Sequence, residues 1–127
     1  MRENMYMKEA LSQAEKAALR GEVPVGAVLV DASGRVLAAF GNETLQRHDP
    51  GAHAEMLCLR AGCLEKESQR LENCDLYVTL EPCAMCAAAI SFARVRRLYF
   101  GAYDPKGGGV EHGGRFYAQP TCHWAPE

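Results

Sequence analysis

The sequence has no long apolar segment. Its 127 residues contain no run near the roughly 18 apolar residues that a membrane-spanning helix needs. The stretch from Met1 to Arg20 mixes charged and polar residues with alanines, so it lacks the continuous apolar region of a secretory signal peptide. We therefore expect a soluble, cytoplasmic protein with no membrane partner.

Compositional bias is also absent. Hydrophobic residues make up 48% and charged residues 24% of the chain, which excludes collagen-like, coiled-coil and disordered proteins. A chain of 127 residues has room for one domain with a core but not for two. We expect residues 1–127 to form a single domain.

The net charge of −2 gives no overall attraction to nucleic acid. Between positions 94 and 115, however, five basic residues stand against two acidic ones. This local excess fits a phosphate-binding edge about as well as an ordinary solvated surface. The basic residues are Arg94, Arg96, Arg97, Lys106 and Arg115.

Apolar periodicity and turn residues predict helices over 3–20, 49–64 and 82–93, with Asp49 as the N-cap of the second and Pro50 in its first turn. Strands are predicted over 24–30, 36–40, 75–80 and 97–100. This order indicates an α/β sandwich with crossover helices on its sheet. The glycine-rich chain beyond Gly101 is expected to be mostly loop.

Six cysteines are present, and a reducing compartment favours metal binding or burial over disulfides. Cys83 and Cys86, three residues apart at a predicted helix start, can share one ion, and His53 supplies a third ligand. Three protein ligands leave a tetrahedral position for water, as in catalytic zinc sites. A fourth ligand requires the tail to fold back. Cys58, Cys63 and Cys74 are expected to fill the core instead.

Glu55 lies two residues after His53, about 200° around a helix, so we expect it beside the zinc-bound water and not as a ligand. Zinc lowers the pKa of water toward about 7, and a neighbouring carboxylate can take and return protons. These groups can replace an exocyclic amino group by oxygen and release ammonia. H-x-E followed by P-C-x-x-C is the known signature of zinc deaminases that act on bases.

Four stretches make the sequence similar to the bacterial tRNA-specific adenosine deaminases of the cytidine-deaminase-like superfamily. They are EVPVGAV at 22–28, DPGAHAE at 49–55, YVTLEPCAMCA at 77–87 and GAYDPKGG at 101–108. The resemblance implies a three-layer α/β/α sandwich with a mixed sheet of about five strands. It also implies one zinc ion per subunit and a homodimer with sites near its interface.

The implied reaction converts the wobble adenosine in the anticodon loop of a tRNA, expected to be an arginine tRNA, to inosine. The resemblance further implies that Asn42 and the backbone at Ala54 hold the purine. Asp104 and Lys106 are then expected near the flanking nucleotides.

Three departures from the family pattern stand out. Gly51 replaces a frequent threonine, and Glu43 stands where a basic residue is common, which could weaken a phosphate contact. The chain also stops at Glu127, where family members usually continue into a C-terminal helix.

Two other functions remain open from the sequence. One is a deaminase of a free base or nucleoside, such as guanine, cytosine or cytidine, with the same zinc site. The other is a zinc-binding partner subunit without catalysis, although a purely structural site does not require Glu55. Inosine formation on anticodon stem-loops, compared with free nucleosides, separates them.

Overall fold

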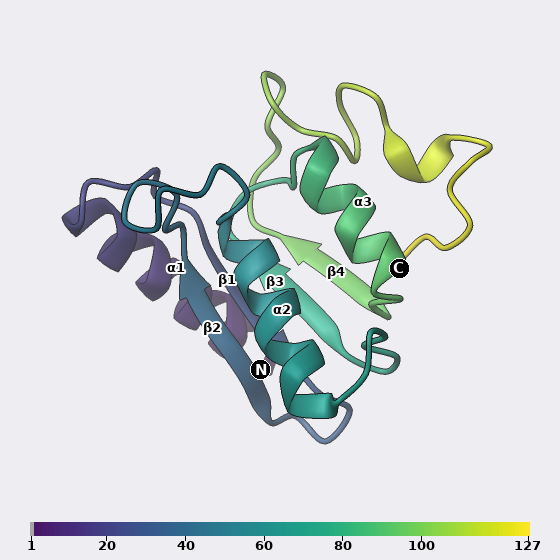
Figure 1. Ribbon diagram of the computed structural model, residues 1–127, viewed down its shortest axis with the longest axis horizontal. Helices are drawn as coiled ribbons and strands as arrows, with labels where there is room; N and C mark the ends of the chain where they lie inside the picture. Colours follow the sequence, from purple (N-terminus) through teal and green to yellow (C-terminus); the bar gives the residue numbers. More distant parts are fainter. Residues whose placement is uncertain (1) are drawn as a thin grey trace.

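Helices and strands follow one another in the predicted order in the computed structural model, which describes residues 2–127 (Figure 1). No helix in this range is long and apolar enough to cross a membrane. The elements are α1 (Arg2–Leu19), β1 (Gly26–Val30), β2 (Val36–Gly41), α2 (Ala54–Lys66), β3 (Asp75–Val78), α3 (Ala84–Phe92), β4 (Arg97–Phe100) and the 3-10 helix η1 (Phe116–Ala118).

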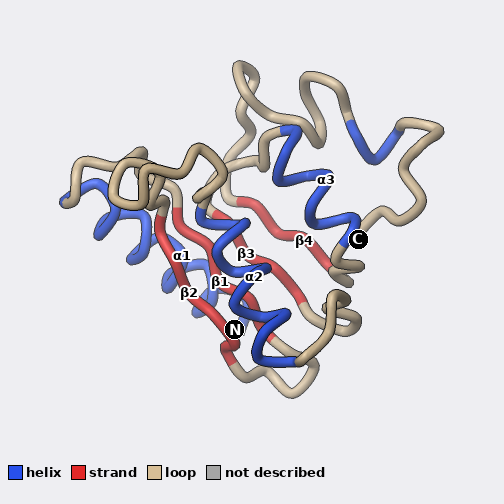
Figure 2. Tube along the Cα trace, viewed as in Figure 1, coloured by secondary structure: helices blue, strands red, loops and turns tan. Residues whose placement is uncertain are grey.

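The sheet has the strand order β2-β1-β3-β4 (Figure 2). β1 pairs antiparallel with both β2 and β3, whereas β3 and β4 run parallel, so the sheet is mixed as expected. Residues 2–127 form four strands in this sheet and not about five. After Phe100 the backbone bonds to Glu81 and Pro82 instead of extending as a further strand.

The helices cover both faces of the sheet, with α1 on one side and α2 and α3 on the other (Figures 1 and 2). Side chains alternate accordingly along β1. Ala27 and Leu29 belong to the core beneath α2 and α3, while Val28 and Val30 face α1. The expected three-layer α/β/α sandwich is confirmed.

The backbones of α1 and β1 are in direct contact at Gly26. A Cβ atom there would collide with the carbonyl oxygen of Ala10 and lie 2.5 Å from the nitrogen of Ala14. Gly26→Ala is therefore expected to destabilise the fold by about 1–3 kcal/mol through overpacking, measured by chemical denaturation. Gly114→Ala is the control, because open space surrounds Gly114, and it should change stability by less than about 0.5 kcal/mol. Equal stability of the two variants would contradict this close approach.

The predicted start of the second helix was wrong. α2 begins at Ala54 with His53 as its N-cap, and Asp49 instead closes a turn, since its carboxylate accepts the N–H of Gly51 at 2.8 Å. This Asx turn directs the chain back toward the sheet, and the N–H of Glu43 bonds to Ala52 at 3.0 Å. α3 likewise begins at Ala84, slightly later than predicted, and β3 ends at Val78.

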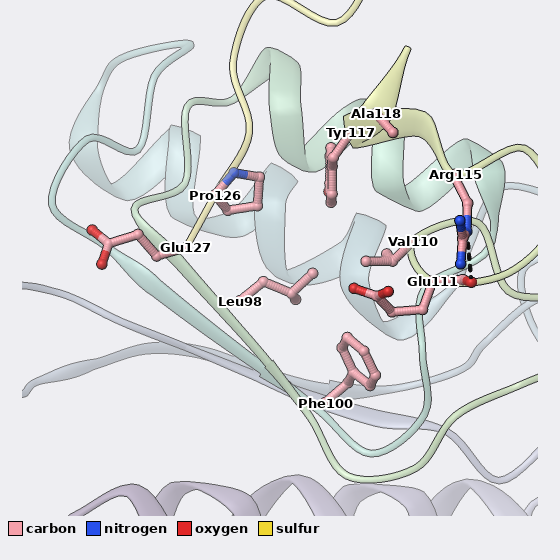
Figure 3. A pocket seen from close by; sticks show the side chains of 9 residues that line it. All are labelled: Leu98, Phe100, Val110, Glu111, Arg115, Tyr117, Ala118, Pro126 and Glu127. Atoms are coloured by element: carbon pink, nitrogen blue, oxygen red, sulfur yellow. Dashed lines mark hydrogen bonds between the residues drawn. The ribbon is translucent and has the colours of Figure 1, made fainter.

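The last residue lies along the outer edge of β4. The N–H of Leu98 donates to the carbonyl of Glu127 at 2.7 Å, and the N–H of Glu127 donates to the carbonyl of Arg96 at 2.9 Å. Between β4 and the tail lies a cavity of about 470 Å³ (Figure 3). None of the residues predicted to form the functional site lines this cavity. Its lining residues are Leu98, Phe100, Val110, Glu111, Arg115, Tyr117, Ala118, Pro126 and Glu127.

Candidate metal centre and base pocket

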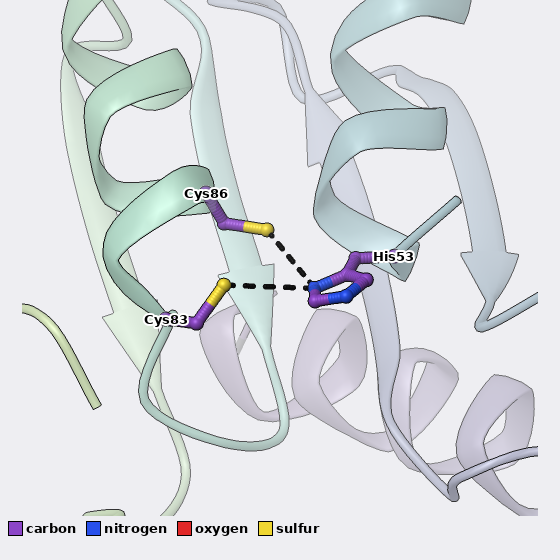
Figure 4. A group of neighbouring side chains, drawn as sticks. All are labelled: His53, Cys83 and Cys86. Atoms are coloured by element: carbon purple, nitrogen blue, oxygen red, sulfur yellow. Dashed lines mark hydrogen bonds between the residues drawn. The ribbon is translucent and has the colours of Figure 1, made fainter. Parts of the chain in front are cut away.

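His53, Cys83 and Cys86 come together where α2 and α3 begin (Figure 4). His53 Nδ1 lies 3.6 Å from Cys83 Sγ and 3.4 Å from Cys86 Sγ. His53 and Cys83 are the N-cap residues of their helices, and Cys86 lies in the first turn of α3. Two loops that leave the same end of the sheet thus bring residues 30 and 33 positions apart into one cluster.

The cluster fits one tetrahedral zinc ion. Zinc binds imidazole nitrogen at about 2.1 Å and thiolate at about 2.3 Å, so two such ligands lie about 3.6 Å apart. The observed separations of 3.6 and 3.4 Å match this value. Among residues 2–127 no further His, Cys, Asp or Glu joins the group. The side chain of His112 bonds to Glu81, and the thiol of Cys122 contacts the hydroxyl of Ser91.

The start of α3 favours an ionised Cys83. A hydrogen bond from the Cys86 thiol and the backbone N–H groups of Cys86 and Met85 lower the pKa of Cys83 to about 5. A thiolate is the form that binds metal. By contrast, burial raises the pKa of Cys58, Cys63 and Cys74, and the first and last of these are fully enclosed in the core. Their predicted role as core residues agrees with this placement.

Glu55 lies beside the cluster without joining it. Its side chain is 3% exposed, and burial raises its pKa to about 7, opposed in part by a hydrogen bond with Cys86. A carboxyl group poised near neutrality can both accept and donate a proton at working pH. This environment suits a proton carrier.

A pocket of about 210 Å³ opens beside the cluster of His53, Cys83 and Cys86. It has room for a single base but not for paired nucleic acid. Its walls combine apolar side chains with a few polar groups, the usual pattern for small-ligand sites. The lining residues are Val23, Val25, Asn42, Thr44, His53, Glu55, Leu80, Glu81 and Cys83.

The four residues expected to contact substrate occupy different places. Asn42 lines the pocket, and its Oδ1 accepts the N–H of the buried Ala54 at 2.8 Å, so that N–H already has a partner within the protein. Asp104 and Lys106 lie outside the pocket lining, in the loop after β4. Asp104 is half-buried and Lys106 is exposed.

The basic residues between positions 94 and 115 do not form one surface. Arg94, Arg96 and Arg97 follow the far end of α3, and the N–H of Arg96 bonds to the carbonyl of Cys74 just before β3 begins. The metal cluster lies at the opposite ends of these elements. Arg96 is also paired with Asp75 at 2.9 Å. A phosphate-binding edge can therefore use only Lys106 and Arg115 from this set.

Glu43, which departs from the family pattern, is engaged within its own loop. Its carboxylate lies 2.7 Å from Arg47 Nε, and both belong to the turn after β2. His48 is exposed in the same turn.

Two buried glutamates near the pocket were missed in the sequence. Burial alone would raise the pKa of Glu81, but hydrogen bonds from Asp104, His112, Glu111 and Val110 outweigh it and lower the pKa to about 2. Glu22 is 5% exposed. The available signal was only an acidic residue next to an apolar strand.

Residues 1–102 match the family model for the cytidine and deoxycytidylate deaminase zinc-binding region. The chain is 59% identical over 122 residues to a tRNA-specific adenosine deaminase of Agrobacterium fabrum, covering 96% of this chain and 80% of that protein. It is 52% identical over 108 residues to the tRNA-specific adenosine deaminase of Bacillus subtilis, covering 84% and 65% of the two chains.

Two solved structures of deaminases are similar in fold to this chain. One comes from a study of A-to-I editing by tRNA:A34 deaminases at the wobble position, with 58% identity and a TM-score of 0.95 over 98% of this chain and 95% of that chain. The guanine deaminase of Bacillus subtilis has 28% identity and a TM-score of 0.78, over 98% and 82%.

Proposed function

Because the chain belongs to the tRNA-specific adenosine deaminase family, we propose that it hydrolyses adenosine to inosine at the wobble position of a tRNA. The observation that carries this proposal is the cluster of His53, Cys83 and Cys86 beside the buried Glu55, next to a pocket sized for one base. Identity with tRNA-specific relatives extends far beyond these four residues. The proposed tRNA substrate therefore rests on identity along the whole chain, and the proposed hydrolytic chemistry rests on the residues of the site.

Zinc, when bound by the three ligands, makes hydroxide available from water near neutral pH. Glu55 accepts one proton from the attacking water and gives it to the purine ring nitrogen; it then accepts the proton of the new hydroxyl group on the ring carbon and gives it to the amino group, which leaves as ammonia. Asn42 orients the base through its amide, while Val25 and Leu80 pack against it and exclude bulk water. An anticodon-loop base is already largely unpaired, so placing it in the pocket costs only a few kcal/mol.

Several finer features belong to the same proposal. We expect one zinc ion per subunit, a homodimer with the sites near its interface, and action in the cytoplasm on an arginine tRNA. The purine contacts of Asn42 and Ala54, and the flanking-nucleotide contacts of Asp104 and Lys106, rest on the family resemblance.

The direct test incubates purified protein with an adenosine-containing anticodon stem-loop and, separately, with free adenosine, cytidine and guanine. Inosine should form on the stem-loop, and free compounds should react poorly. The structural likeness to a guanine deaminase makes guanine the most informative rival substrate. Efficient turnover of a free base with an unchanged stem-loop would replace the proposal by that rival.

Lys106→Ala should weaken stem-loop binding about 3- to 10-fold and reduce the salt dependence of binding by about one phosphate contact. Lys106 is exposed in the loop after β4, and the family resemblance implies that it lies near the flanking nucleotides. Lys66→Ala is the matched control, since Lys66 ends α2 on the side away from the site. Fluorescence anisotropy over a salt series measures both variants. Equal losses in the two would assign the effect to net charge alone.

A further inference from the structure

Two loops near the pocket are each held by the side chain of one buried glutamate: the loop that follows β2, which contributes Thr44 to the pocket lining, and the loop that follows β4, which bonds to the lining residue Glu81. Glu22 is 5% exposed, and the side chain of Glu81 has no exposed surface. Neither belongs to the metal-ligand cluster. A buried carboxylate is unfavourable unless hydrogen bonds replace its lost water, so its partners identify what it holds in place.

The partners of Glu81 all lie in the loop that follows β4. Its Oε2 accepts the backbone N–H groups of Val110, Glu111 and His112 at 3.2, 2.9 and 3.1 Å. Its Oε1 accepts the N–H of Asp104 at 3.1 Å and the Nδ1–H of His112 at 2.8 Å. The Glu81 side chain thus joins Asp104, near the start of this loop, to residues 110–112, near its end.

The loop also lies directly on the start of α3. A Cβ atom on Gly108 would collide with Oε2 of Glu81, which means that the loop reaches the carboxylate only with glycine at this position. Gly109 donates its N–H to the carbonyl of Pro82 at 2.8 Å, and a Cβ atom there would lie 2.6 Å from the nitrogen of Ala84. The loop is therefore fixed relative to the helix turn that carries the cysteine ligands.

Asp104 and Lys106 take their conformation from this arrangement. Asp104 Oδ1 accepts the N–H groups of Lys106 and Gly107, both at 3.1 Å. The N–H of Asp104 in turn bonds to Glu81. A change at Glu81 is consequently transmitted to Lys106 through one short chain of hydrogen bonds.

Glu22 holds a second loop in the same way. The carboxylate of Glu22 accepts the Thr44 hydroxyl at 3.3 Å and the N–H groups of Leu45 and Gln46 at 3.1 and 2.9 Å. Thr44 lines the pocket. The two glutamates therefore hold two different loops near the same pocket.

We propose that Glu81 is a positioning residue, which holds the loop of residues 101–113 so that Asp104 and Lys106 stand ready for RNA, and that Glu22 does the same for residues 44–46. This inference rests on the proposed action on tRNA. A loop that is already ordered loses less conformational entropy when its ligand binds, which strengthens binding. Glu81 acts through the loop, so its loss should affect substrate binding more than the chemical step.

Glu81→Gln tests the inference, because an amide cannot accept hydrogen bonds on both of its terminal atoms. Amide hydrogen exchange in residues 101–113 should accelerate at least about tenfold. KM for the anticodon stem-loop should rise at least about fivefold, while kcat and zinc content stay within about twofold. A purely structural role would lower global stability without this division between KM and kcat.

Three variants complete the test. Glu72→Gln changes an exposed glutamate and should leave exchange and kinetics unaltered. Glu22→Gln should accelerate exchange in residues 44–46 and not in the loop after β4. His112→Gln disturbs the imidazole contact at the partly exposed rim, and it should give a smaller effect in the same direction as Glu81→Gln. It also keeps the test possible if Glu81→Gln does not fold.

Unchanged exchange in residues 101–113 would overturn the inference. So would a loss of zinc and kcat at constant KM, since that pattern places Glu81 in support of the neighbouring Cys83. Wild-type protein that leaves the stem-loop unmodified rejects the proposed function. In that case hydrogen exchange still decides whether Glu81 holds the loop.

Discussion

Glu55→Gln should lose at least about 10²- to 10⁴-fold in turnover on an anticodon stem-loop while retaining its zinc. The amide has nearly the same shape as the carboxyl group, so it should fit the same buried position, but it cannot accept and return a proton. Inosine formation under single-turnover conditions and metal analysis of the same sample measure the two quantities. Glu15→Gln, on the exposed side of α1, is the control and should keep full activity.

Besides the expected role of Glu55 as a proton carrier, two other outcomes are possible. Loss of zinc would make it a ligand, contrary to its position outside the cluster of His53, Cys83 and Cys86. Turnover close to that of the wild type would remove it from the proton transfer altogether.

The second large effect is expected for Cys83→Ala. Zinc content should fall from about one equivalent per chain to nearly none, since two remaining ligands hold the ion poorly. Metal binding is coupled to folding, so the melting temperature should drop by more than about 5 °C, equivalent to a loss of at least about 1 kcal/mol. Elemental analysis and thermal unfolding measure these changes.

Cys63→Ala provides the matched control for that experiment. Cys63 lies within α2 and is partly buried, and it packs against the core without belonging to the cluster. It should keep zinc and lose only the stability that its packing contributes. Full zinc content in Cys83→Ala would refute the three-ligand assignment.

Local patterns in the sequence were sufficient for most of the fold. Apolar periodicity located β4 at Arg97–Phe100, as the structure has it, and ended α1 before Gly21, which adopts a φ of 84°. The sequence also singled out His53, Cys83 and Cys86, which the structure brings together, because the three-residue spacing of the two cysteines at a helix start places both thiols on one face.

Interactions between distant parts of the chain could not be predicted from local sequence patterns. Glu81 meets partners 23 to 31 residues away, and Glu22 meets partners 22 to 24 residues away. No local pattern encodes such pairs. The sequence could not show for the same reason that the basic residues between positions 94 and 115 lie on different surfaces. Arg94, Arg96 and Arg97 lie between the end of α3 and the start of β4, away from the site, and the chain returns toward the site only after β4.

The start of α2 shows how one residue type serves two structures. Asp49 before Pro50 is as typical of an Asx turn as of a helix N-cap. The choice is made by the backbone bond between Glu43 and Ala52, which ties the turn to the end of β2. That bond exists only in the folded chain.

The contact of Glu127 with the outer edge of β4 has a consequence for self-association. An uncovered edge strand offers free N–H and C=O groups to a strand of another molecule, which is a common route to aggregation. Glu127 occupies the N–H of Leu98 and the carbonyl of Arg96, and its carboxylate lies 3.7 Å from Arg97 Nε. Glu127 thereby places charge and hydrogen-bond partners on a strand only four residues long, which opposes intermolecular extension of the sheet on that side.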